Sequence, residues 1–593
     1  MSALWDALRN LLDLLPREAR SFLLRYSISS SVLSLLDIVA LSLLALILGR
    51  IATGTDVVLP VVGTLSQTEA LWALVFACLL MVTKSAISLG QQWYVTRRMA
   101  HFELLIGDRL FNAYIRAPWL ERIKRNSAEL VRMADVGIAN TTAGLLLPVA
   151  SLPSQVVTMV SVLVVLVVAQ PITAITTLVY LGLIALLLYG WVSRRAVVNG
   201  RRNRDFSFRT ATLMTEMVQA LKEITLRDKA GEVASLVNDS RGEAVRARAA
   251  IGFLGAVPKF VLDAAIIVGF LIVGGAGYLL SGGLEGAIVS IALFGLASFR
   301  LVPSMLQFQS VMTSTASTLP HARAVIRDIR AAEEYRAAAE VTGFGYISPE
   351  PERLEFVDVG FTYPDTPSSA LDDVRLSIPF GSHVAFVGAS GAGKSTMIDL
   401  LLGLITPTAG RIVVDDTDLA EVVGTWRQRV GYVPQEVALF DGTIGQNIAL
   451  TWTHDYNRDA ALAAALRAQL SGVLEAREGG LDARIGERGV ALSGGQRQRL
   501  GIARALYTDP MVLVMDEATS ALDTATEEAV TAAIAELRGA VTVVTVAHRL
   551  TTVRNADLVC FFAEGRLVAQ GTFEEVVSST PDFAAQARLA GLA

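Results

Sequence analysis

Long runs of apolar residues dominate the first half of the chain. A helix needs about 20 residues to cross the hydrocarbon core of a bilayer. Runs of sufficient length lie near residues 22–50, 69–96, 139–169, 172–193, 252–280 and 285–312. The pattern therefore predicts six membrane-spanning helices, arranged as three hairpins.

The connections between these runs differ in length and charge. Those at 51–68, 170–171 and 281–284 are short and poor in positive charge, whereas 97–138 and 194–251 are long and rich in arginine. Because an excess of Lys and Arg marks cytoplasmic loops, we expect the two long loops and both termini in the cytoplasm. The expected location is the cell inner (plasma) membrane. The long loops also have helical patterns, so the membrane helices are expected to continue into the cytoplasm.

An amphipathic segment precedes the first apolar run. Leu8, Leu11 and Leu15 recur at helical spacing, while Asp6 and Arg9 interrupt any apolar core. This pattern predicts a helix with one apolar face. The helix could lie on the membrane surface or pack against the protein's own helices, and the sequence leaves both open.

Composition agrees with a chain that is partly in lipid. Of its 593 residues, 52% are hydrophobic and only 18% are charged, whereas about one-quarter of a soluble domain is charged. The net charge of −5 implies no general affinity for nucleic acid. Cys78 and Cys560 both lie in apolar runs, so they suggest neither a disulfide framework nor a metal site.

A glycine-rich loop follows an apolar strand-like run at 384–387. The next eight residues have the pattern G-x-x-x-x-G-K-[ST], whose backbone N–H groups wrap phosphates at the N-terminus of a helix. We expect Lys394 to reach the β- and γ-phosphates of ATP and the Ser395 hydroxyl to bind Mg²⁺. The predicted nucleotide contacts of this loop are Gly388, Ser390, Gly391, Gly393, Lys394, Ser395 and Thr396.

Two further motifs support a nucleotide site. The apolar run at 512–515 ends in Asp516 and Glu517, which suit holding Mg²⁺ and polarising the attacking water, respectively. A second phosphate-binding helix N-terminus is predicted at Ser493, Gly494, Gly495 and Gln496. Two such termini cannot approach one γ-phosphate from the same side, so a second copy of the domain is expected to face the first.

These motifs and their order resemble ABC transporters of the exporter type, in which membrane and ATPase domains are fused. Residues 492–496 match the family's signature sequence at every position. The resemblance implies an ATP sandwich in which Ser493 and Gly495 of one subunit close on nucleotide held by the other. It also implies roles for four more residues: adenine stacking for Tyr363, Mg²⁺ binding and coupling for Gln435, cross-dimer contact for Asp523 and γ-phosphate contact for His548. Since no position in this set is degenerate, a homodimer with two competent sites is favoured over a heterodimer.

The resemblance also suggests the domain organisation. Composition changes after residue 320, and Pro349 and Pro351 precede a strand-like run at 354–363. The expected class is a multi-domain membrane protein with a six-helix transmembrane exporter domain and an α/β P-loop nucleotide-binding domain. The expected parts are an amphipathic helix at 1–20, a transmembrane domain at 21–325, a linker at 326–352 and an ATPase domain at 353–593. Within the two long loops, residues 119–126 and 221–228 are expected to be coupling helices that dock on the ATPase near Gln435.

Charged residues inside the apolar runs give a first signal about cargo. Lys84, Lys259 and Arg300 fall at the level of the cytoplasmic leaflet on three helices, which favours a site for an anionic headgroup. Alternatively, they reach the inner interface or pair with Asp37 and Asp263.

Three short stretches point to one kind of cargo. Residues 124–130, 257–260 and 299–304 resemble the lipid-linked oligosaccharide flippase subgroup, in which basic residues line the cavity and cargo is a polyprenyl-pyrophosphate-linked glycan. Lys259 stands where that subgroup leads us to expect arginine. The rival interpretations are an exporter of drugs or simple lipids and, more distantly, an ATP-gated channel or sensor.

Overall fold

The structure is a computed structural model, which describes residues 2–53, 57–59, 63–65, 67–124, 136–280, 283–339, 343–364, 366–518, 524–537, 539–547 and 553–589. The chain forms two compact units. The first comprises Met1–Ala117 and Glu121–Arg336, and the second comprises Pro118–Leu120 and Ala337–Ala593.

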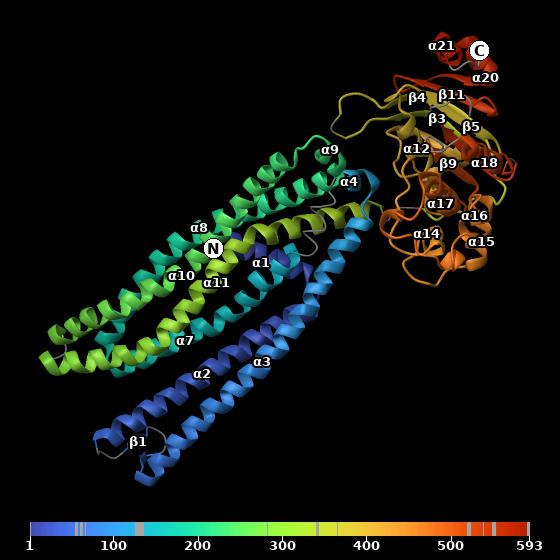
Figure 1. The fold of residues 1–593 in the computed structure, drawn as a ribbon. Helices are drawn as coiled ribbons and strands as arrows, with labels where there is room; N and C mark the ends of the chain where they lie inside the picture. Colours follow the sequence, from blue (N-terminus) through green and yellow to red (C-terminus); the bar gives the residue numbers. More distant parts are fainter. Residues whose placement is uncertain are drawn as a thin grey trace. The chain divides into compact units, whose positions relative to one another are not determined.

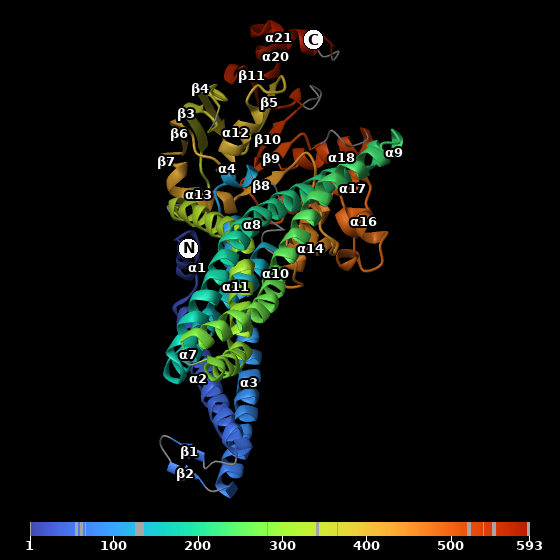
Figure 2. The same cartoon turned by 90° about the vertical axis from the view of Figure 1, so that its left-hand side faces the viewer.

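Long α-helices make up the first unit (Figures 1 and 2). In chain order its helices are α1 (Ser2–Leu14), α2 (Arg17–Thr53), α3 (Gln67–Ile115), α6 (Ile138–Thr141), α7 (Leu147–Ala169), α8 (Pro171–Gln219), α9 (Leu221–Leu226), α10 (Ala230–Leu280) and α11 (Gly283–Ala339). A π-helical turn, Thr142–Leu146, joins α6 to α7. An antiparallel pair, β1 (Val57–Leu59) and β2 (Gly63–Leu65), lies between α2 and α3.

Five stretches of helix among the described residues are long and apolar enough to cross a membrane. They are Trp72–Ile115, Ile138–Ala169, Pro171–Gln219, Ala230–Leu280 and Gly283–Ala331. The chain is therefore a multi-pass membrane protein. The predicted span at 22–50 falls within α2, but many of its side chains lie outside the described residues, so the count of six stays a prediction.

These helices are much longer than a bilayer is thick. α8 has 49 residues, α10 has 51 and α11 has 57. At about 1.5 Å per residue they measure roughly 75–85 Å, against about 30 Å for the hydrocarbon core. The helices are therefore long enough to extend well beyond the membrane, as the helical patterns of the two long loops predicted.

The amphipathic α1 packs against the protein's own helices. Leu11 is fully buried, and Leu14 and Leu15 are nearly so. They share one core with Ile106 of α3 and Ile329 of α11. Of the two locations that the sequence left open, these contacts favour packing inside the protein.

Two β-sheets form the framework of the second unit. The larger has the strand order β12-β11-β5-β10-β9-β8, and the smaller has the order β4-β3-β6-β7. The larger sheet is parallel except for β12. The strands are β3 (Arg353–Phe361), β4 (Leu371–Pro379), β5 (His383–Gly388), β6 (Ala409–Val414), β7 (Thr417–Asp418), β8 (Val430–Val433), β9 (Val512–Asp516), β10 (Thr542–Val546), β11 (Leu558–Ala563) and β12 (Arg566–Gly571).

Helices complete this unit and cover its cores. They are α12 (Lys394–Leu401), α13 (Leu419–Gln428), α14 (Ile444–Ala449), α15 (Arg458–Arg467), α16 (Ser471–Glu475), α17 (Gly494–Leu506), α18 (Thr524–Ala535), α20 (Phe573–Ser579) and α21 (Pro581–Leu589). The short α4 (Trp119–Ile123) begins in this unit and ends in the first. One core joins both sheets to α12 and α13, and another lies around α14, α15 and α17. The predicted combination of membrane helices with an α/β nucleotide-binding domain is confirmed.

The sheet register determines where the site can form. Phe386 of β5 pairs with Val546 of β10, which in turn pairs with Asp516 of β9. Because these strands are parallel, their carboxyl ends meet at one edge of the sheet, where α/β proteins bind ligands. Strands lie about 4.8 Å apart, so the ends of β5 and β9 are about 10 Å from each other.

Candidate functional site

The loop between β5 and α12 has a shape that requires glycine. Gly388, Gly391 and Gly393 have φ values of 151°, 80° and 100°. A Cβ added to Gly388 would lie 2.2 Å from the Phe562 carbonyl oxygen, and one added to Gly393 would lie 2.7 Å from Leu371 Cδ2. Gly391 has open space around it, so its backbone angle alone favours glycine there. The glycines thus allow a tight turn of the kind that cradles phosphate.

Lys394 begins α12 and lies across this loop. Its ammonium donates hydrogen bonds to the carbonyl oxygens of Gly388 (2.7 Å) and Ala389 (2.9 Å). Burial lowers the pKa of Lys394, while the negative charges of Glu517 and Asp516 act in the opposite direction. A cation held between the loop and two carboxylates suits binding of the terminal phosphates of a nucleotide.

Gln435 and Glu517 meet beyond the end of β9. Gln435 Nε2 donates a hydrogen bond to Glu517 Oε2 at 2.7 Å. Glu517 has a φ of 49°, in the left-handed region that non-glycine residues seldom adopt. Such strained backbone occurs preferentially at functional sites. Because Nε2 of Gln435 already donates this hydrogen bond, its Oε1 is the atom that can accept a hydrogen bond or bind a metal ion.

A second acid near Asp516 was not singled out from the sequence. Asp399 lies on α12, and burial followed by the charge of Asp516 raises its pKa to about 6. The Trp119 side chain donates a hydrogen bond to Asp399, which acts to lower that pKa. The Tyr432 hydroxyl lies 3.5 Å from Asp516 Oδ2, at the outer limit for a hydrogen bond. Burial and then the charges of Asp516 and Asp399 raise the pKa of Tyr432 to about 12.

One sequence signal could have identified Asp399. It is the only ionisable residue in the run 397–402, which is otherwise apolar. An isolated acid in an apolar helix needs a partner when it is buried. Its partner Trp119 is far away in the sequence, in the predicted coupling segment 119–126, and residues 118–120 group with the second unit.

The N-terminus of α17 is closed by its own side chains. Ser493 Oγ accepts a hydrogen bond from the Gln496 N–H (3.2 Å), and Gln496 Oε1 accepts one from the Ser493 N–H (3.0 Å). This reciprocal arrangement is a capping box. Ser493 is exposed at the surface of the second unit. The helix start is therefore ordered and accessible in a single chain.

Tyr363 is joined directly to the phosphate-loop helix. Its hydroxyl lies 3.1 Å from Thr396 Oγ1, and its ring makes an edge-on contact with Phe361 at 4.9 Å between centroids. Asp523 and His548, which the resemblance assigned to the dimer contact and the γ-phosphate, lie outside the described residues. Their roles stay predictions.

The three predicted cargo-binding cations lie on three helices of the first unit. Lys84 is on α3, Lys259 on α10 and Arg300 on α11. Lys259 is exposed, whereas Lys84 and Arg300 are half-buried and interact with other groups. Asp263 of α10 is exposed, and the side chain of Asp37 lies outside the described residues.

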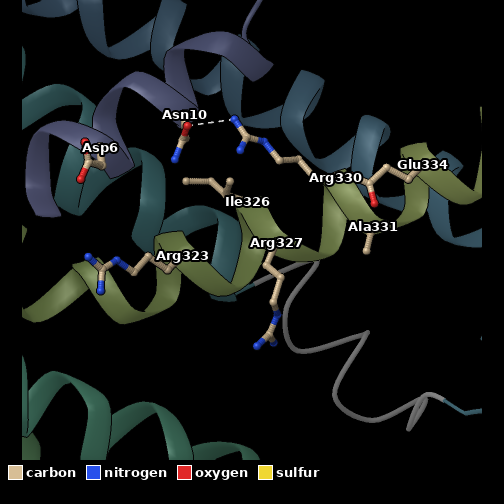
Figure 3. Close-up of a pocket in the computed structure, with 8 residues that line it drawn as sticks. All are labelled: Asp6, Asn10, Arg323, Ile326, Arg327, Arg330, Ala331 and Glu334. Atoms are coloured by element: carbon tan, nitrogen blue, oxygen red, sulfur yellow. Dashed lines mark hydrogen bonds between the residues drawn. The ribbon is translucent and has the colours of Figure 1, made fainter.

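A surface groove of about 520 Å³ lies between α1 and α11 (Figure 3). Asp6 and Glu334 line it together with Arg323, Arg327 and Arg330. Arg330 donates a hydrogen bond to Asn10 Oδ1 at 2.9 Å across the groove. None of the three predicted cargo-binding cations lines this groove, so it does not form the site that the sequence analysis proposed.

Fold and site together define a membrane protein with a fused P-loop ATPase. Residues 371–520 match the ABC transporter family, and this part of the chain is an ABC transporter ATP-binding domain, which binds ATP. The chain has the exporter fold: it is similar to a bacterial Atm1-family ABC exporter with ATP bound, with a TM-score of 0.77 and 21% identity over 97% of this chain and 98% of the other. The predicted architecture, membrane helices fused to an ABC-type nucleotide-binding domain on one chain, is confirmed.

Two relatives show higher identity over shorter stretches. The β-(1→2)glucan export ATP-binding/permease protein NdvA of Rhizobium etli is 41% identical over 288 residues, which is 48% of this chain and 48% of the relative. The ATP-dependent lipid A-core flippase of Salmonella typhimurium is 44% identical over 226 residues, which is 38% of this chain and 39% of the relative. The chain thus matches about half or less of the length of these relatives.

Proposed function

We propose that two copies of this chain form an ATP-driven exporter in the plasma membrane, with the ATPase units and both termini in the cytoplasm. The observation that carries this proposal is the pair of phosphate-binding elements in one ATPase unit, the loop at Gly388–Gly393 and the exposed, capped start of α17. Each nucleotide then lies between Lys394 of one copy and Ser493 of the other. The arginine-rich loops support the cytoplasmic location.

The oxygen atoms near the site fit Mg²⁺. Ser395 Oγ and Gln435 Oε1 belong to exposed side chains, and Asp516 adds a carboxylate. Mg²⁺ prefers hard oxygen ligands and is commonly held by one or two carboxylates together with substrate phosphates. When bound, the ion would neutralise charge on the phosphates.

Glu517 then polarises the water that attacks the γ-phosphate. Its carboxylate can accept a proton, and the hydrogen bond from Gln435 holds it in place. ATP binding closes the two ATPase units, and residues 118–120 on the ATPase transmit that closure to α3 and the loop after it, which turns the membrane cavity outward. Hydrolysis resets the cycle.

The proposed cargo is a lipid-linked oligosaccharide or a similar anionic amphiphile, moved from the inner to the outer leaflet. Lys84, Lys259 and Arg300 supply positive charge at the depth of inner-leaflet headgroups. One relative is named for glucan export and the other for flipping lipid A-core, and both names favour a sugar-bearing or lipidic cargo over a drug. The rival function is export of drugs or simple lipids, and an ATP-gated channel or sensor is the more distant alternative.

The first test measures ATPase activity of the purified protein in lipid vesicles. Polyprenyl-pyrophosphate-linked glycans and hydrophobic drugs are added separately. The proposal expects stimulation by the glycolipids and loss of that stimulation in Arg300→Gln. Stimulation by drugs alone would move the cargo to the rival class while leaving the ATPase assignment intact.

A transport assay tests the charged residues together. Neutralising Lys84, Lys259 and Arg300 to Gln should abolish glycolipid transport while basal ATPase activity stays within about twofold, because none of the three lies in the ATPase unit. Changing Arg241, an exposed cation on α10 outside the predicted coupling segments, to Gln is the matched control. Unchanged transport in the triple variant would eliminate the anionic-headgroup site.

A further inference from the structure

Two membrane helices carry the same aromatic–cation pair where their apolar runs end. Arg97 follows Trp93 by one turn on α3, and Arg195 follows Trp191 by one turn on α8. Arg97 Cζ lies 4.4 Å from the Trp93 ring centroid, and Arg195 Cζ lies 4.8 Å from the Trp191 ring centroid. The apolar runs end near residues 96 and 193, so in both helices the ring falls inside the run and the cation just outside it.

Both pairs are exposed on the single chain. Trp93 is 59% exposed and Trp191 is 41% exposed, and both arginines are exposed as well. Neither guanidinium forms an ion pair or hydrogen bond with another residue in the described part of the chain. Arg98 differs from its neighbour, because its guanidinium lies 3.5 Å from the Glu18 carboxylate and over the buried ring of Phe102.

The geometry of each pair leaves hydrogen-bond donors available. A guanidinium that stacks on a ring uses its flat face, while its N–H donors lie along its edge. Those donors match phosphate oxygens and can engage two of them at once. Tryptophan rings favour the interface between hydrocarbon and water, which is the level of lipid headgroups.

We propose that the Trp93–Arg97 and Trp191–Arg195 pairs are binding sites for anionic phospholipids of the inner leaflet. The guanidinium binds the headgroup phosphate, and the indole packs beside the first part of the acyl chains. Arg194, which is exposed beside the second pair, adds positive charge that favours a lipid with a net negative headgroup over a zwitterionic one. The leaflet rests on the orientation given in the proposed function, whereas the binding itself requires only that these helices cross the membrane.

Tryptophan quenching in vesicles tests this proposal. The full-length protein is reconstituted in a fixed mixture of phosphatidylcholine and phosphatidylglycerol, with brominated acyl chains on one lipid or the other. Bromine quenches nearby indoles, so enrichment of phosphatidylglycerol at the pairs should make its brominated form the stronger quencher. In Trp93→Phe/Trp191→Phe most of this difference should disappear.

The arginine variants test the headgroup contact. In Arg97→Gln/Arg195→Gln the preference for phosphatidylglycerol at each pair should fall about fivefold, because each pair loses one cation near an anionic surface. Arg98→Gln removes the same charge from a guanidinium that Glu18 already holds, so it should keep the preference. Equal quenching by the two lipids, or a preference that survives the double arginine change, would overturn the proposal.

Quenching by neither lipid at Trp93 and Trp191 would also overturn it, because the pairs would then be covered by protein. The measurement uses no nucleotide and both leaflets have the same lipids. Its outcome is therefore independent of whether the chain exports the proposed cargo.

Discussion

Replacing Trp119 with Phe tests how residues 118–120 are held on the ATPase unit. The indole donates a hydrogen bond to Asp399, and its ring packs against the core that includes α12. Phenylalanine keeps the apolar contact but lacks the indole N–H, which is the only donor of the side chain. A hydrogen bond to a charged group contributes about 1.5–3 kcal/mol. Because Asp399 is only partly buried, screening by solvent should reduce the contribution to about 1–1.5 kcal/mol, at or just below that range.

Hydrogen exchange on the full-length protein measures this loss locally. A decrease of that size in the free energy of opening should make amides at 115–124 exchange about five- to tenfold faster than in the wild type. Asp399→Asn retains a carbonyl acceptor but loses the charge that strengthens the hydrogen bond, so it should raise the exchange rate in the same direction by a smaller factor. Trp452→Phe changes an exposed indole that stacks on Phe440 in the same unit, and it should have no effect at 115–124. Wild-type exchange in Trp119→Phe would refute the role of this hydrogen bond.

The pH dependence of the same measurement has a defined sign. Burial raises the pKa of Asp399 from 3.8 to about 6, so the folded state binds more protons than the unfolded state in that interval. The stability from this group is present below pH 3.8 and is lost as pH rises through about 6. The Trp119 hydrogen bond opposes this loss, because it favours the ionised carboxylate. The increase in amide exchange caused by Trp119→Phe should therefore be small at pH 5 and reach its full size at pH 7. When Asp399→Asn is also present, this increase should not depend on pH.

Three further predictions concern the nucleotide site. Glu517→Gln should still bind ATP but lose about 10²- to 10⁴-fold in steady-state phosphate release, the range for a general base; near-normal hydrolysis would disprove the assignment. Tyr363→Ala should weaken ATP binding about two- to tenfold through loss of the ring, whereas Tyr363→Phe, which loses only the contact with Thr396, should weaken it less in the same binding assay. Ser493→Ala removes the α17 cap, worth about 0.5–2 kcal/mol at a helix start. It should lower phosphate release while ATP binding at Lys394 persists, and equal loss of both would argue against a site shared by two copies.

The nucleotide site was predictable because its motifs are local in the sequence. The loop at 388–395 follows a strand directly, and the carboxylates at 516 and 517 end another strand, so short patterns define both. Parallel strands then place those ends at one edge of the sheet without further information. The hydrogen bond from Gln435 to Glu517 was not predictable, since each motif indicates a role in the site but not which side chains meet. Trp119 and Asp399 lie far apart in the sequence, and neither has a local pattern that names the other.

In the membrane half, the sequence predicts the position of the helices but not their rotation. Five of the predicted runs coincide with long apolar helices, because the apolar requirement of the bilayer applies to every residue in a run. It could not determine which way Lys84, Lys259 and Arg300 face, since a helix that is apolar on all sides has no periodicity to fix its rotation.

For a similar reason, the sequence could not determine whether α1 lies on the membrane surface or packs against the protein's own helices. Its periodicity specifies that Leu11 and Leu15 lie on a buried face, but the hydrophobic effect is non-directional and does not distinguish lipid from protein as the apolar partner. Only the shared core with α3 and α11 decides between them. Trp93 and Trp191 present the opposite case, because no described core covers them and the adjacent guanidinium adds the chemical specificity that an apolar face lacks.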